Sequence, residues 1–336
     1  MPESSRMKLR NSHGAILLPF LLFAGSLLAT PAGAEVGDTS SQARQLINAM
    51  SAAAKHLNYD GVFVYRHGNR LDTLRIIHQG DGDQERERLV SLSGFAREVI
   101  RDADSVTCYF PDDQAVMVEK SRPRKFLATQ LPHPIEKIAD FYDFSVTGKE
   151  RVAGRAAWVV NITPRDDYRY GYQLWIDEET RLLLKSELHD DSGWPVEQIL
   201  FTSITFPADI QPDLLKPALS GKGYTWYTSK VAATAIASDT SAWLVSSPPA
   251  GFVLDAMEKQ QADDSALEHI VYTDGLAMVS IFIERMQAGE QSRTQPVIVG
   301  GVNTVAVYSN GYQITAMGEV PLKTVRQMAS SVMWNR

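Results

Sequence analysis

The sequence has 336 residues and a single cysteine, so no disulfide can form within the chain. Stability must therefore come from buried apolar surface. Cys108 stands in the middle of the apolar run Val-Thr-Cys-Tyr-Phe, where a buried cysteine usually acts as a small hydrophobic side chain. We expect that structural role for Cys108, rather than a catalytic or a paired thiol.

The short motifs of common enzymes are also missing. The chain has no Gly-x-Ser-x-Gly, no His-Glu-x-x-His, no glycine-rich phosphate loop and no Cys-x-x-Cys. The histidines lie far apart in sequence, and the acidic pairs stand in predicted turns, where aspartate is favoured because it bonds to the backbone. We therefore predict a protein that is not an enzyme, with no cofactor and no metal site.

The chain has no excess of positive charge, since its net charge is −7. Nucleic acid is a poor candidate partner, because its binding depends on lysine and arginine at phosphates. One basic cluster stands out and consists of Lys120, Arg122, Arg124 and Lys125. It has two interpretations: a site for anions or an acidic partner, or a solvated loop.

Long apolar runs are absent outside the first thirty-odd residues. The run from Ala15 to Ala29 follows a short basic segment and precedes Ala32-Gly33-Ala34, a typical cleavage site. A retained anchor is the alternative, but the run falls short of the ~20 residues that span a bilayer. We predict a signal peptide over residues 1–34, cleaved after Ala34, and an exported protein that does not span the membrane.

What the sequence does contain is a long series of strand-like segments. A helical pattern with a one-sided apolar stripe covers residues 42–57, and ten or eleven short strands follow up to residue 206. Short links make such strands antiparallel neighbours, and a sheet this wide tends to curl or close. We predict a first domain over residues 35–206 and a linker, rich in proline and glycine, over residues 207–223.

The second predicted domain covers residues 224–336 and is a smaller antiparallel sheet with a helix. Two hairpins turn at Asp274-Gly275 and Asn310-Gly311, dipeptides typical of type I′ turns. Pro321 stands where a helix would begin, and apolar residues line one face of the segment after it. The fold class is therefore mainly antiparallel β with helices.

Several strands of the first domain are apolar on both faces. In Tyr59–Gly68, Val62 and Val64 point to one side while Phe63 and Tyr65 point to the other. Packing by protein on both sides would satisfy this pattern; a curved sheet with a cavity for an apolar ligand would do so too. If the cavity exists, the face pattern predicts that it is lined by Phe63, Tyr65, Tyr172, Leu174, Ile176, Leu182 and Leu184.

The first hairpin of the second domain is unusually apolar. Val279, Ile281 and Ile283 share one face, and Met278 and Phe282 share the other. The closing helix carries too few large residues to cover both faces. The free face would bind a partner or the first domain, and we predict contact residues among Met278, Ile281 and Phe282.

Five stretches, in order along the chain, carry a resemblance to a known family. They are YDGVFVYRHG, YGYQLWID followed by RLLLKSEL, EQILFTSI, HIVYTDGLAMVSIFIE and VYSNGYQITAMGEVP. In these stretches the chain resembles the RseB/MucB family, periplasmic negative regulators of the envelope-stress sigma factor. The resemblance runs from about residue 59 to residue 332.

The resemblance implies a large domain similar to the carriers LolA and LolB, a half-open β-barrel with an apolar cavity, followed by a smaller domain. It implies a periplasmic protein that binds the periplasmic part of a membrane-anchored anti-sigma factor, RseA or MucA, and hinders its site-1 cleavage. Lipopolysaccharide or mislocalised lipoprotein would release it. A periplasmic lipid or lipoprotein carrier is the alternative function, and the oligomeric state is left open, a homodimer included.

Overall fold

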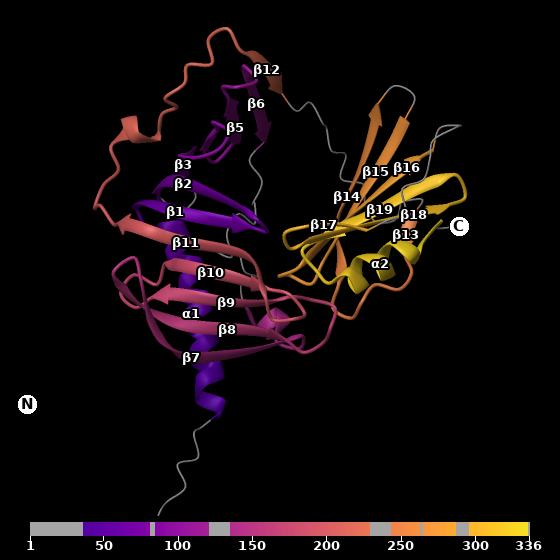
Figure 1. The fold of residues 1–336 in the computed structure, drawn as a ribbon, viewed down its shortest axis with the longest axis horizontal. Coiled ribbons are helices and arrows are strands. Elements are labelled where there is room, and N and C mark those ends of the chain that lie inside the picture. The colour runs from indigo at the N-terminus through magenta and orange to yellow at the C-terminus, as the bar shows by residue number, and fades with distance from the viewer. Residues whose placement is uncertain are drawn as a thin grey trace, which may run out of the picture. The chain divides into compact units, whose positions relative to one another are not determined.

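The computed structural model describes residues 36–80, 85–120, 135–228, 243–262, 265–286 and 296–334 (Figure 1). The predicted signal peptide lies outside the described residues, as do Arg122, Arg124 and Lys125 of the basic cluster. Residues 36–336 form one compact unit. Among the described residues, no helix is both long and apolar enough to cross a membrane.

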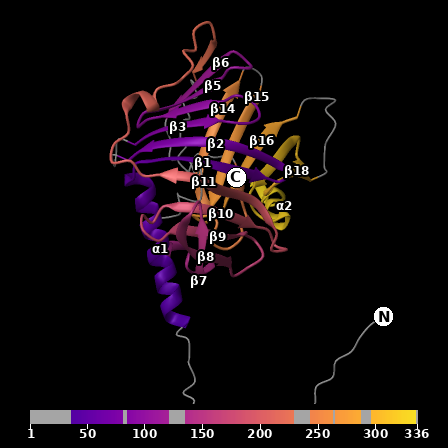
Figure 2. The same ribbon diagram turned by 60° about the vertical axis from the view of Figure 1, so that its left-hand side comes forward.

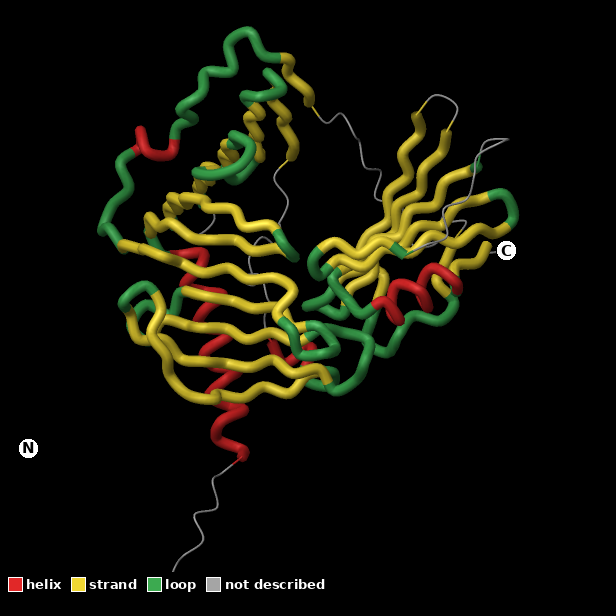
Figure 3. The backbone as a smooth tube through the Cα atoms, viewed as in Figure 1, coloured by secondary structure: helices red, strands yellow, loops and turns green. Residues whose placement is uncertain are grey.

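A large sheet of twelve strands dominates the first part of the chain (Figures 1 and 3). Its strands are β1 (Tyr59–His67), β2 (Arg70–Gln79), β3 (Arg86–Ser91), β4 (Glu98–Arg101), β5 (Ser105–Phe110), β6 (Ala115–Lys120), β7 (Tyr142–Val152), β8 (Arg155–Pro164), β9 (Gly171–Asp177), β10 (Leu183–His189), β11 (Pro195–Thr205) and β12 (Thr225–Thr228). They pair in the order β12-β6-β5-β4-β3-β2-β1-β11-β10-β9-β8-β7.

Only one pairing of this sheet, β12 with β6, is parallel. The two edge strands, β12 and β7, do not pair with each other, so the sheet is half-open, as predicted. Because β12 belongs to this sheet, the chain stays with the large sheet as far as Thr228, beyond the boundary expected after residue 223. The division into two domains at that boundary remains a prediction.

Helix α1 (Val36–His56) covers one face of β7 to β10 (Figure 1). Ala43, Leu46, Ile47 and Met50 follow the spacing of one helical face, and all four are buried. The core beneath the helix contains Tyr142, Phe144, Val160, Ile162, Leu174, Ile176 and Leu183. The short helix η3 (Ile135–Ile138) completes this core through its two isoleucines.

The opposite face of the same strands is covered by the sheet itself. The second core contains Val152, Ala157, Val159, Trp175 and Leu184, with Leu200 and Ile204 partly buried against it. Strands β7 and β11 approach each other although three strands separate them in the sheet order, so the sheet curls over this core. Protein therefore covers both faces of the two-sided strands.

A β-bulge in β10 changes the face of the sheet on which Leu184 lies. Leu183 pairs with Ile176 and Lys185 pairs with Trp175, so the register shifts at Leu184. Two residues of the bulged strand then oppose one residue of its partner. Strict alternation fails there: Leu184 joins Trp175 on the curled side, whereas Leu182 packs with Phe63 in a third core. Leu184 therefore lies in a different core from Leu174 and Ile176, although all three were predicted to line one cavity.

The segment expected to be a free linker packs on the large sheet. Ile210 and Leu215 are buried against Ile77 of β2, and Pro212–Leu215 forms the short helix η4. Glu98 of β4 accepts two hydrogen bonds of 3.0 Å from the backbone N–H of Ala218. The segment is therefore a strap that covers the face of β2 to β4 opposite to Phe63.

The second part of the chain is a six-stranded sheet with a helix (Figure 2). In pairing order its strands are β14 (Val253–Ala262), β15 (Ser265–Thr273), β16 (Met278–Arg285), β19 (Tyr312–Gly318), β18 (Val302–Ser309) and β17 (Val297–Val299). Helix α2 (Leu322–Ser330) packs Val325, Met328 and Ala329 against it. β13 (Trp243–Val245) and β20 (Val332–Trp334) form a separate pair, and Trp243, Val245 and Val332 belong to the same core.

One of the two predicted type I′ turns is confirmed. Asn310 and Gly311 have φ of 52° and 81° between Ser309 and Tyr312, which pair directly. At the other hairpin the prediction is wrong, because Thr273 pairs with Met278 and leaves a four-residue loop. Asp274 holds that loop by accepting hydrogen bonds from the N–H groups of Leu276 and Ala277 at 2.8 and 2.7 Å.

Candidate functional site

The contacts between the large sheet and the six-stranded sheet centre on a fully buried arginine. Arg169, in the loop before β9, donates from Nη1 to Asp274 Oδ2 at 2.9 Å and from Nε to Asp166 Oδ1 at 3.0 Å. Its Nη2 donates to the carbonyl oxygen of Ala250 at 2.6 Å. The rings of Phe141, Phe252 and Tyr142 surround the guanidinium at 4.7–5.5 Å. The carboxylates hold the guanidinium by charge, and the aromatic rings pack against this planar group.

Asp274 is the acceptor at the centre of this junction cluster, which we define as Tyr142, Arg169 and Asp274. Its side chain is fully buried, and it also accepts a hydrogen bond of 2.8 Å from the Tyr142 hydroxyl. Burial, followed by the charge of Asp274, raises the pKa of Tyr142 well above its usual range. The tyrosine therefore remains a neutral donor, and every polar atom of the Asp274 carboxylate has a partner.

Neighbouring hydrogen bonds extend the junction. Asn303 of β18 donates to the Tyr170 hydroxyl at 2.9 Å, and Thr324 of α2 donates to the Tyr168 carbonyl oxygen at 2.6 Å. Lys323 pairs with Asp167 at 2.5 Å, but both side chains are about half exposed or more. The loop before β9 is thus the main polar contact of the large sheet with the six-stranded sheet.

A second cluster of titratable side chains joins the same two sheets. It consists of His67, Glu197 and Glu319, and we call it the carboxylate–histidine cluster. One nitrogen or oxygen atom from each side chain lies within 4.8 Å of the other two. The Tyr65 hydroxyl donates to Glu197 Oε2 at 2.9 Å. Burial and the neighbouring Glu197 carboxylate raise the pKa of Glu319 to about 8, because two close carboxylates cannot both ionise freely.

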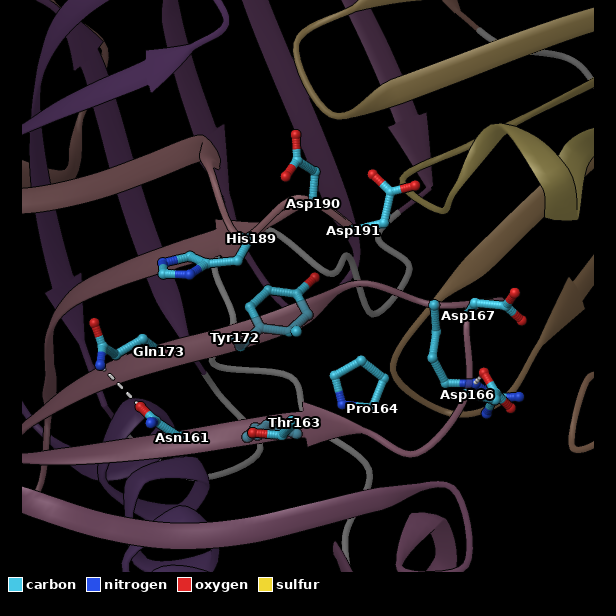
Figure 4. Close-up of a pocket in the computed structure, with 14 residues that line it drawn as sticks. Asn161, Thr163, Pro164, Asp166, Asp167, Tyr172, Gln173, His189, Asp190 and Asp191 are labelled. Atoms are coloured by element: carbon cyan, nitrogen blue, oxygen red, sulfur yellow. Dashed lines mark hydrogen bonds and ion pairs between the residues drawn. The ribbon is translucent and has the colours of Figure 1, made fainter.

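A pocket of about 380 Å³ opens at the ends of β8, β9 and β10 (Figure 4). Tyr172 lies between His189 of β10 and Pro164 of β8, and burial raises the pKa of the Tyr172 hydroxyl. Asp166, Asp167, Asp190 and Asp191 also line this rim pocket. The first three already bind Arg169, Lys323 and backbone N–H groups respectively, so their carboxylates are not available as a cation site.

A larger pocket of about 490 Å³, here called the sheet pocket, lies at the other half of the large sheet. Tyr65, Leu74 and Phe110 form its apolar part, and Phe95, 78% exposed, stands at its edge. Its charged side chains are Arg70, Asp72, Arg97, Asp112 and Asp113. This lining suits a ligand with both an apolar part and charged groups better than a bare acyl chain.

The predicted cavity residues fall into two groups. Phe63, Leu174, Ile176, Leu182 and Leu184 are at most 3% exposed and belong to three different protein cores. Tyr65 and Tyr172 instead line the sheet pocket and the rim pocket. The structure thus brings only the two tyrosines to described pockets, and a role for any of the seven in ligand binding remains a prediction.

The predicted partner residues lie on opposite faces of β16. Ile281 is fully buried in the core beneath α2, while Met278 and Phe282 are half-buried on the other face. Phe282 stacks on His269 with ring centroids 4.3 Å apart and planes 6° from parallel. Lys120, the described member of the basic cluster, is exposed at the end of β6.

Sequence reasoning missed Arg169 and Asp274. Arg169 stands in the run Arg-Asp-Asp-Tyr-Arg-Tyr, which has the composition of an exposed turn, and Asp274 has the signature of a hairpin turn. The sequence did contain one signal, which is an arginine that stands between two tyrosines and close to two adjacent aspartates. Nothing in the linear sequence links two positions 105 residues apart.

Two antiparallel sheets, joined by a buried ion pair and with pockets on the large sheet, define the class of fold to which the chain belongs. The family model of the MucB/RseB N-terminal domain matches residues 42–219, and that of the MucB/RseB C-terminal domain matches residues 237–333. The chain belongs to the MucB/RseB family, which confirms the resemblance found in the sequence.

Curated relatives match nearly the whole chain. The sigma factor AlgU regulatory protein MucB of Pseudomonas aeruginosa is 32% identical over 321 residues, which cover 93% of this chain and 96% of the relative. The sigma-E factor regulatory protein RseB of Haemophilus influenzae is 28% identical over 91% of this chain and 94% of its own length. These names describe regulatory proteins, not enzymes.

Solved structures give the same result. A crystal structure of MucB in complex with MucA(peri) has a TM-score of 0.69 and 29% identity, and covers 88% of this chain and 99% of its own. A crystal structure of MucB without a named partner has a TM-score of 0.60 at 28% identity, with the same coverage.

Proposed function

We propose that this protein is a periplasmic regulator that binds the periplasmic domain of a membrane-anchored anti-sigma factor and shields it from site-1 proteolysis. It acts by occupancy and carries out no chemistry of its own. The observation that carries this proposal is the similarity to MucB bound to MucA(peri), which extends over 99% of that MucB chain.

The face of the six-stranded sheet opposite to α2 is the proposed contact surface. Phe282 and Met278 of β16 lie on it, and Met317 of the neighbouring β19 is 37% exposed. A flexible segment can bind along such a sheet face through alternate side chains. Occupying the segment in this way would deny a protease access to its cleavage site.

The test uses purified protein and the periplasmic domain of the anti-sigma factor from the same organism. We expect a complex by isothermal titration calorimetry and slower site-1 cleavage in proportion to occupancy. Phe282→Asp should weaken both effects, because it places a charge in a half-buried apolar contact. Trp194→Asp is the control, since it makes the same kind of change at an aromatic side chain that is 72% exposed and lines neither described pocket.

Two results would contradict parts of the proposal. Binding without protection would remove the shielding mechanism, and full protection by folded Phe282→Asp would move the contact surface elsewhere. Lipopolysaccharide and acylated lipoprotein are added in a second arm, where each is expected to release the complex. The carrier alternative predicts that the acylated ligand binds while the anti-sigma domain does not.

A further inference from the structure

The carboxylate–histidine cluster is built from three separate parts of the fold. His67 ends β1, and Glu197 is its direct partner on β11. Glu319 directly follows β19, an inner strand of the six-stranded sheet, and precedes the segment that leads into α2. All three side chains are half-buried, and one ligand atom from each lies within 4.8 Å of the others. Within the described part of the chain, no other group of three or more such side chains meets this geometry.

Within the described ranges, the cluster brings two carboxyl groups together without a lysine or arginine partner. Among the described residues, no lysine or arginine forms an ion pair with Glu197 or Glu319. Two half-buried carboxylates that face each other and an imidazole need either a shared proton or a bound cation.

The surroundings hold the donor groups in place. The Tyr65 hydroxyl donates to Glu197 Oε2 at 2.9 Å and holds this side chain in position. The His67 ring lies directly on Gly300, where a Cβ atom would collide with the ring and where φ is +58°. Carboxylates that bind a metal commonly accept such hydrogen bonds from neighbouring side chains, and these bonds fix their orientation.

We propose that His67, Glu197 and Glu319 form a zinc-binding site that links the large sheet to the six-stranded sheet. Imidazole nitrogen and carboxylate oxygen are both ligands of zinc, and a site with three protein ligands takes a water molecule in the fourth position. An imidazole ligand disfavours calcium and magnesium, which prefer oxygen donors. Ligand atoms around tetrahedral zinc lie ~3.3 Å apart, so the side chains must close by up to about 1.5 Å.

This site would add a metal-dependent clamp to the junction. Zinc that binds the folded chain stabilises it by mass action, and the gain rises with zinc concentration above the dissociation constant. Because Glu319 belongs to one sheet while His67 and Glu197 belong to the other, only the joined arrangement offers all three ligands. The inference does not depend on the identity of the protein partner.

The test titrates zinc alone into the full protein after chelator treatment, in competition with a fluorescent zinc indicator at pH 7. We expect one tight zinc per chain and a rise in melting temperature. His67→Ala and Glu319→Gln should abolish both. Tyr65→Phe, which removes only the hydrogen bond to Glu197, should weaken binding by roughly 10- to 100-fold. Cobalt(II) gives an independent readout, because its visible absorption intensifies in a four-coordinate site.

His189→Ala is the matched control, because His189 also contacts a carboxylate, Glu187 at 3.0 Å, but lies outside the cluster. It should leave the tight zinc unchanged. Absence of a tight zinc in the wild-type protein would overturn the proposal. So would a tight zinc that survives in folded Glu319→Gln, or one that is lost in His189→Ala, because the metal would then sit elsewhere.

Discussion

Breaking the buried ion pair of the junction cluster should be among the most damaging single changes in this protein. The Arg169 and Asp274 side chains are both fully buried, 2.9 Å apart. Arg169→Met keeps much of the side-chain volume but leaves the Asp274 charge with only the Tyr142 hydroxyl and two backbone N–H groups. Asp274→Asn leaves the guanidinium with Asp166 as its one charged partner.

The expected magnitude follows from desolvation. Removing one partner of a buried pair costs about 3–5 kcal/mol, because the remaining charge stays buried without compensation. Removing both charges together avoids that penalty. The double variant should therefore be less destabilised than the sum of the single variants, by about 2–3 kcal/mol.

Urea unfolding, followed by intrinsic fluorescence, measures these differences. Arg165→Met is the control, since Arg165 pairs with Asp143 at 2.7 Å where both side chains are at least half exposed. We expect no measurable change there, because solvent screens exposed pairs. Additive effects of the two junction variants, or losses below about 1 kcal/mol for each, would refute the view that this ion pair fixes the junction.

Two further predictions concern the large sheet. Burial alone would raise the pKa of Asp177, but hydrogen bonds from Arg155 and from Thr180 outweigh it and hold this pKa below its usual range. The stability that Asp177 provides is therefore present at neutral pH and is lost as the pH falls through the lowered pKa. Arg155→Met should make acid unfolding, followed by circular dichroism, begin at a higher pH. An unchanged acid transition would contradict this. Leu184→Ala should cost about 2–5 kcal/mol of unfolding free energy in urea, because it leaves a cavity between the curled strands. Leu71→Ala, at a residue 64% exposed, should cost little, and equal losses would show that the curled core is not tightly packed.

Most strands could be predicted from alternation and turn residues alone. The run Ser105–Phe110 and the turn at Asn310-Gly311 agree with the structure, because each is determined by local sequence. Strand β12 was missed because four residues carry little pattern, and its partner β6 lies more than a hundred residues earlier in the chain. A parallel pairing of this kind depends on tertiary position, which periodicity does not report.

The candidate sites were harder to predict, because each depends on register. The bulge at Leu184 reverses the expected face, and the strand sequence gives no sign of it. His67 and Glu197 become neighbours only after a register shift between Val62 and Phe63. Asp274 resembles a turn residue and is one, but its second oxygen serves a guanidinium from the other sheet. Composition indicated the turn and could not indicate this contact.

The two-sided apolar strands have one physical explanation in each half of the large sheet. In β8 to β10, α1 fills one face and the curled sheet fills the other, so Leu174 and Ile176 are core residues with no exposed surface. In β2 to β4, the strap covers the face opposite to Phe63, while Tyr65 and Leu74, on the side of Phe63, line the sheet pocket. A ligand that enters this pocket contacts Tyr65, whose hydroxyl holds Glu197 of the carboxylate–histidine cluster. Tyr65 therefore belongs both to the lining of the sheet pocket and, through this hydrogen bond, to the surroundings of the carboxylate–histidine cluster.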